Sequence, residues 1–75
     1  MEIRASYESR GMNLSELARI LTGISGVEKC TLANSNEETA TYDLTLEDNT
    51  QLMNFHTVPQ KKGYLCYRVK NRGAE

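Results

Sequence analysis

The chain has 75 residues, enough for one domain with a small core, and its 39% hydrophobic and 25% charged residues are typical of a folded protein. The net charge of −1 argues against a non-specific nucleic-acid binder, because such domains are usually clearly basic. No apolar run approaches the ~20 residues that a membrane-spanning helix needs, so we expect no insertion into a membrane.

The first part of the chain predicts a strand followed by a helix. Residues 2–8 alternate between polar and apolar, which is the period of a half-buried strand. The turn that follows contains Gly11, which can adopt a positive φ. Asn13 is a good N-cap with Glu16 three residues later, and apolar residues then recur at helical spacing. We therefore expect a helix over residues 13–24.

The rest of the chain predicts strands, with one ambiguous segment. Residues 27–33 and 39–47 have the pattern of strands joined by an Asn-rich turn, and residues 63–70 have that of a last strand. Residues 50–58 fit either a strand or a short helix that Pro59 ends. The Thr, Phe and Val content of this segment favours the strand.

These elements predict a single α+β domain over residues 1–75, in which one helix packs on an antiparallel or mixed sheet of four or five strands. The first strand and the strand after the helix should run parallel through a right-handed crossover, with room for another strand between them. The expected core consists of Ile3, Ala5, Tyr7, Leu14, Leu17, Leu21, Ile24, Val27, Tyr42, Leu44, Leu46, Leu65 and Val69.

No residues have the spacing of a catalytic or metal site. The one histidine, His56, has no nucleophile or carboxylate at a diagnostic spacing. Together with Cys30 and Cys66 it would offer only three ligands, without the paired spacing that zinc sites show. We therefore expect no enzyme activity, no cofactor and no metal. We also expect a cytoplasmic protein in which both cysteines are reduced.

Charge is spread unevenly along the chain. Residues 25–50 carry six acidic residues against Lys29, and residues 51–75 carry five basic residues against Glu75. Neighbouring strands from the two segments are expected to neutralise each other across the sheet. A functional surface with one acidic and one basic side is the alternative interpretation.

Basic and aromatic residues are interleaved near the C-terminus, and this pattern predicts an interaction surface. Its residues are Lys61, Lys62, Tyr64, Arg68 and Lys70. Such a pattern can hold phosphates and stack bases, so nucleic-acid binding through the last strand is one interpretation. The other is a solvated edge strand, whose charges discourage unwanted strand pairing.

The run from Arg10 to Leu21, together with the strand that follows, resembles the first half of an ACT-type regulatory domain over residues 2–48. In that family a strand leads through a glycine-containing loop into a helix. The resemblance implies a ferredoxin-like fold, here with a reduced second helix, that pairs with a second copy or a neighbouring domain. It also implies that a small ligand, such as an amino acid, binds near Gly11 and Asn13.

The leading hypothesis is a non-enzymatic interaction or regulatory module that binds another protein, with a homodimer as one form. It follows from the small sheet, the missing catalytic set and the uneven charge. A small-ligand sensor of ACT type is the second hypothesis. Nucleic-acid binding through the basic last strand is the third hypothesis, and enzyme activity is the least expected.

Overall fold

The computed structural model describes residues 1–72 and alternates strands and helices in the order βαββαβ. The elements are β1 (Glu2–Glu8), α1 (Leu14–Thr22), β2 (Val27–Ser35), β3 (Thr39–Leu46), α2 (Asn54–Gln60) and β4 (Leu65–Asn71). Within the described residues, no helix has the length and apolar character needed to cross a membrane.

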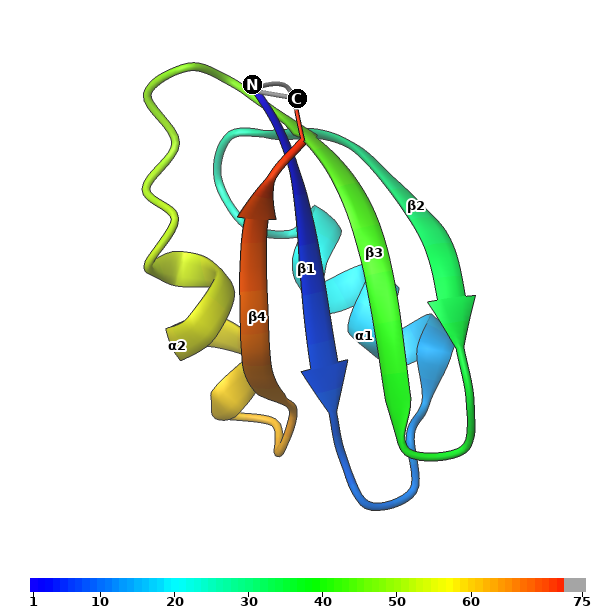
Figure 1. Ribbon diagram of the computed structural model, residues 1–75. Helices are drawn as coiled ribbons and strands as arrows, with labels where there is room; N and C mark the ends of the chain where they lie inside the picture. The colour runs from blue at the N-terminus through cyan, green and yellow to red at the C-terminus, as the bar shows by residue number, and fades with distance from the viewer. Residues whose placement is uncertain (73–75) are drawn as a thin grey trace.

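The strands form one antiparallel sheet in the order β2-β3-β1-β4, and both helices cover the same face of it (Figure 1). Because β3 pairs antiparallel with both β1 and β2, those two strands run parallel with β3 between them, as predicted. This topology is the ferredoxin-like α+β fold. The other face of the sheet, which is turned toward the viewer in Figure 1, carries no helix and is called the open face below.

The core lies between the helices and the covered face of the sheet. Its buried residues are Ile3, Ala5, Tyr7, Leu17, Leu21, Ile24, Ala40, Tyr42, Leu44, Leu46, Phe55 and Tyr64. The expected core residues Leu14, Val27 and Val69 are partly buried against this cluster. The periodicity of β1, α1 and β3 therefore identified most of the core correctly, whereas Phe55 and Tyr64 were not expected there.

Leu65 is the expected core residue that the structure exposes. The alternation in the last strand predicts it on the core face with Val69, but its side chain is 50% exposed. A β-bulge explains the difference: Val69 lies opposite Ala5, whereas Cys66 lies opposite Tyr7, so β4 has one residue more than β1 between these pairs. The extra residue shifts the alternation, and Cys66 rather than Leu65 packs against the core.

Residues 50–58 do not form a strand, so the preference stated above was wrong. The chain instead forms the short helix α2, which includes Pro59 rather than ending before it. Phe55 and Pro59 are buried one helical turn apart, and Val58 packs against the core beside them. This spacing puts the apolar side chains on one face of a helix, whereas Thr57, which shares a strand face with Phe55, is exposed.

Pro59 is tolerated inside α2 because the hydrogen bond that it cannot make is replaced. A proline has no N–H to donate to the carbonyl one turn earlier, which here belongs to Phe55. The Tyr7 hydroxyl of β1 donates to this carbonyl oxygen at 2.7 Å. Burial raises the pKa of the Tyr7 hydroxyl, which keeps it protonated and able to donate.

Candidate functional site on the open face

The open face carries a shallow polar hollow of about 490 Å³ that is lined from all four strands, and we call it the open-face hollow. Its lining residues are Arg4, Ser6, Ala33, Asn34, Thr41, Arg68 and Lys70. Ser6 is buried and shares a hydrogen bond of 3.0 Å with the Thr41 hydroxyl. The hollow therefore combines three cations with hydroxyl and amide groups, and none of its lining side chains is a carboxylate.

The strand register brings the positive charges together. Arg68 lies opposite Ser6, and Lys70 lies directly opposite Arg4 on the neighbouring strand. Like charges in opposite positions destabilise a sheet, and the ion pair between Arg4 and Asp43 offsets part of this repulsion. Arg68 makes no ion pair with any carboxylate of residues 1–72.

Asp43 on β3 lies beside the hollow and is held by two arginines. Arg4 donates from Nε to Oδ1 at 2.7 Å and from Nη2 to Oδ2 at 3.2 Å, and Arg72 Nη1 lies 2.6 Å from Oδ2. Arg72 also pairs with Glu2. The hydrogen bond from Arg4 and the two positive charges hold the pKa of the Asp43 carboxyl below its usual value. The pair of Arg72 with Asp43 joins the basic and acidic segments, but β1 lies between β3 and β4, so the two segments do not neutralise each other as neighbouring strands, contrary to expectation.

Substituting Asp43→Asn should lower the free energy of unfolding at neutral pH and leave little difference from the wild type in acid. A carboxyl whose pKa is depressed in the folded state stabilises that state above its unfolded pKa of about 3.9. This contribution disappears as the pH falls through the lower folded value. Urea unfolding at pH 7 and at about pH 3 measures both differences. If the difference in unfolding free energy between the wild type and Asp43→Asn is as large at pH 3 as at pH 7, the ion pair does not account for it.

The residues predicted for the basic interaction surface separate into three places. Arg68 and Lys70 line the open-face hollow. Lys61 and Lys62 are exposed in the turn after α2 and are not among the residues that line the hollow. Tyr64 is only 3% exposed, so its place on an interaction surface is corrected: it is a core residue.

The Tyr64 hydroxyl binds the start of α1. It donates to the Glu16 carboxylate at 2.6 Å and lies 3.3 Å from the Asn13 carbonyl oxygen. The Asn13 side chain accepts from the Glu16 backbone N–H at 3.0 Å, which confirms the predicted N-cap. Asn13 is therefore engaged in capping α1, and Gly11 beside it adopts the expected positive φ of 72° in an exposed turn.

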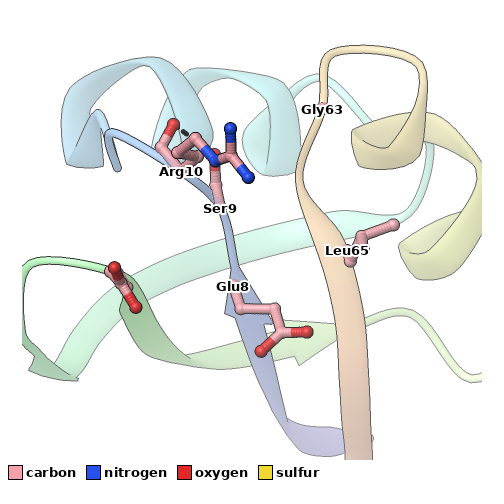
Figure 2. A pocket seen from close by; sticks show the side chains of 6 residues that line it. Glu8, Ser9, Arg10, Gly63 and Leu65 are labelled. Atoms are coloured by element: carbon pink, nitrogen blue, oxygen red, sulfur yellow. Dashed lines mark hydrogen bonds between the residues drawn. The ribbon is translucent and has the colours of Figure 1, made fainter.

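A second hollow of about 340 Å³ lies next to the Gly11 turn (Figure 2). Its lining residues are Glu8, Ser9, Arg10, Glu38, Gly63 and Leu65. Figure 2 shows Glu8 and Leu65 side by side on neighbouring strands, with Ser9 and Arg10 continuing from the end of β1. The lining of this hollow contains one arginine and two glutamates, and neither Gly11 nor Asn13 is part of it.

The two cysteines lie on opposite edge strands, Cys30 on β2 and Cys66 on β4. Three strand spacings of roughly 4.8 Å separate these strands by about 14 Å, so the cysteines are at least that far apart and cannot form a disulfide. Burial raises the pKa of the Cys30 thiol to about 11 and also raises that of Cys66. Both thiols are therefore protonated at neutral pH and are poor nucleophiles. Within residues 1–72, no three His, Cys, Asp or Glu residues gather into a group that could hold a metal ion.

Arg4, Ser6, Asn34 and Thr41 are residues of the hollow that were not singled out from the sequence. Each occupies a polar position of a strand, a pattern that also describes ordinary solvated positions. The informative signal was the pairing of β4 with β1, which puts Arg68 and Lys70 beside Arg4. That pairing follows from the strand order and not from any local motif.

The fold and the hollow together define a ferredoxin-like α+β domain whose uncovered sheet face carries a cluster of cations. Comparisons with models of known protein families, with curated proteins and with solved structures find no match to this chain.

Proposed function

We propose that this chain is a non-enzymatic interaction module that binds a partner protein on the open face of its sheet. The observation that carries the proposal is the open-face hollow, where Arg4, Arg68 and Lys70 converge from two strands. Arg68 makes no ion pair with any carboxylate of residues 1–72, so its guanidinium is available to an anionic group of a partner.

The sheet edges are less suited to binding than the face. Both edge strands are irregular: β2 shows register shifts near each end against β3, and β4 carries the bulge against β1. Bulges and positive charges on edge strands discourage another strand from pairing there. Because the helices cover one face of the sheet and the edges are unsuited to pairing, the open face is the surface of the sheet that we propose for a partner.

A second copy of the chain fits the open face less well than a different protein does. In a symmetric face-to-face dimer, each hollow would meet the same cluster of cations, and like charges across an interface are costly. Light scattering behind a sizing column measures the oligomeric state. A dimer that Arg68→Glu breaks would show that the homodimer uses this face and would overturn the preference for a different partner.

The test of the proposal is differential capture from native lysate by immobilised wild type and two charge variants. The double variant Arg68→Ala/Lys70→Ala should lose a protein that the wild type retains. The control Lys61→Ala/Lys62→Ala removes the same charge in the turn after α2 and should still retain it. Two results would contradict binding at the open face. In one, the wild type and both double variants retain the same lysate proteins. In the other, a captured protein is lost only with the Lys61→Ala/Lys62→Ala control. Circular dichroism checks that the variants are folded.

A small-ligand sensor of ACT type is the second candidate, favoured by the hollow next to the Gly11 turn. Arg10 could bind a carboxylate there, while Glu8 and Glu38 could bind an ammonium group, the two charges of a free amino acid. A thermal-shift screen with the free amino acids tests this candidate. Absence of any shift at millimolar concentrations would count against it.

A further inference from the structure

We infer that the partner segment bound by the open-face hollow is an extended acidic stretch of polypeptide whose carboxylates lie against Arg68 and Lys70. The inference rests on the proposed function and specifies the chemistry of the partner. It is carried by three features of the open face: the donors in the hollow, a carboxylate that the face already binds, and the acidic residues at its two ends.

The hollow offers hydrogen-bond donors that match carboxylates. Arg68 presents a guanidinium with no ion pair to any carboxylate of residues 1–72, and a guanidinium can bind a carboxylate through two parallel hydrogen bonds. Lys70 adds a second positive charge, and the Asn34 amide and Thr41 hydroxyl add neutral donors from β2 and β3. Carboxylates of a partner would therefore find several donors within the hollow.

The open face already binds one carboxylate in this way. Arg4 engages both oxygens of Asp43 from the neighbouring strand, through Nε at 2.7 Å and Nη2 at 3.2 Å. Arg68 lies on the other side of β1 from Asp43, since the strand order is β3-β1-β4. An acidic side chain of a partner at Arg68 would repeat the contact that Asp43 makes with Arg4.

The acidic residues on β1 favour a polypeptide over a nucleic acid. The open face of β1 begins with Glu2 and ends with Glu8, about 20 Å apart at roughly 3.4 Å per residue. A nucleic-acid backbone that runs along β1 carries a charge at every phosphate and would approach Glu8, whereas Arg72 offsets the charge of Glu2. A polypeptide can place its acidic residues in the middle and neutral or basic residues at the ends.

The lining of the hollow also lacks a platform for bases. Single-stranded nucleic acids gain much of their affinity from stacking on aromatic side chains, and no lining residue is aromatic. The overall charge of −1 gives no long-range attraction for a polyanion. Charge complementarity at this face is local, and a short acidic segment matches it best.

The experiment is fluorescence anisotropy with three labelled probes at low and at physiological salt. The first probe is a capped peptide of about eight residues with glutamates in the middle and a lysine at each end. The second replaces the glutamates with glutamines, and the third is an oligothymidylate of similar length. The full chain is titrated as wild type, as Arg68→Ala/Lys70→Ala and as Lys61→Ala/Lys62→Ala.

The dissociation constants of the glutamate peptide for the wild type and for the Lys61→Ala/Lys62→Ala control should agree within about twofold. The Arg68/Lys70 variant should bind it at least about tenfold more weakly, because hydrogen bonds between charged groups are lost. The glutamine peptide should not bind. Tighter binding of the oligothymidylate than of the glutamate peptide would overturn the inference, and so would equal weakening by both double variants.

Failure of this inference can be distinguished from failure of the proposed function. If no acidic peptide binds but the Arg68/Lys70 variant still loses a captured protein, the partner uses the open face without an acidic segment. The inference would then be wrong and the proposed function would stand. If the captured protein is retained by that variant as well, the proposed function is wrong.

Discussion

Replacing Gly26 with alanine is expected to lower the free energy of unfolding by about 2–5 kcal/mol. Gly26 has a φ of 95°, in the region that side-chain-bearing residues rarely adopt. An added Cβ would lie 2.1 Å from Thr50 Oγ1 and 3.1 Å from both Thr50 Cβ and Cγ2. A rotamer change that turns Oγ1 away would still leave Thr50 Cβ at 3.1 Å and would give up the contact of Oγ1 with the Gly26 carbonyl oxygen.

Gly63 provides a matched control for this substitution. Its φ is 90°, yet an added Cβ would meet nothing within 4 Å. Gly63→Ala should therefore cost only the backbone strain, about 1–2 kcal/mol. In a Thr50→Ala background, which removes both γ atoms, the cost of Gly26→Ala should fall toward that of Gly63→Ala. Urea unfolding of the four variants measures these differences. Equal costs for Gly26→Ala and Gly63→Ala would contradict the close approach between Gly26 and Thr50.

The contact between Gly26 and Thr50 is also relevant to α2, because it fixes the chain that leads into that helix. Gly26 precedes β2, and its carbonyl oxygen accepts from the Glu47 N–H at 2.9 Å and lies 3.4 Å from Thr50 Oγ1. The loop after β3 is therefore attached to the start of β2. This attachment matters because α2 has only seven residues and no side-chain cap at its N-terminus. Tertiary contacts must supply most of its stability.

Local sequence patterns predicted the elements whose signals are strong along the chain. The alternation of β1 and β3 and the capped, periodic α1 are signals of this kind, because each residue's burial follows from its own segment. The helix α2 could not be predicted in the same way. Its intrinsic helix signal is weak and Pro59 opposes it, so packing of Phe55 and the hydrogen bond from Tyr7 decide its conformation.

The candidate site was predictable only in part for a related reason. Arg68 and Lys70 were evident as basic residues of the last strand, but Arg4 and Thr41 join them only through the order of the strands. The bulge in β4 also changes the exposure of Tyr67, which the alternation of polar and apolar residues along the strand does not predict. It leaves Tyr67 54% exposed, although simple alternation puts this residue on the face that packs inward with Leu65.

The hydrogen bond between Tyr7 and Phe55 makes a second large effect testable: Tyr7→Phe should cost about 1–3 kcal/mol of unfolding free energy. The substitution keeps the buried ring and removes only the hydroxyl that donates to the Phe55 carbonyl at 2.7 Å. Because Pro59 has no N–H, that carbonyl would lose its donor in a buried environment. The free energy of unfolding from urea titrations gives the magnitude.

Pro59→Ala turns this prediction into a double-mutant cycle. Alanine restores an N–H that can donate to the Phe55 carbonyl within the helix, so the loss of the Tyr7 hydroxyl should be partly compensated. Tyr7→Phe should therefore cost less in the Pro59→Ala background than in the wild type, by about 0.5 kcal/mol or more. A cost that is the same in both backgrounds would mean that the hydroxyl does not substitute for the missing helix hydrogen bond. The stability of α2 would then have to come from the burial of its apolar side chains and from its other tertiary contacts.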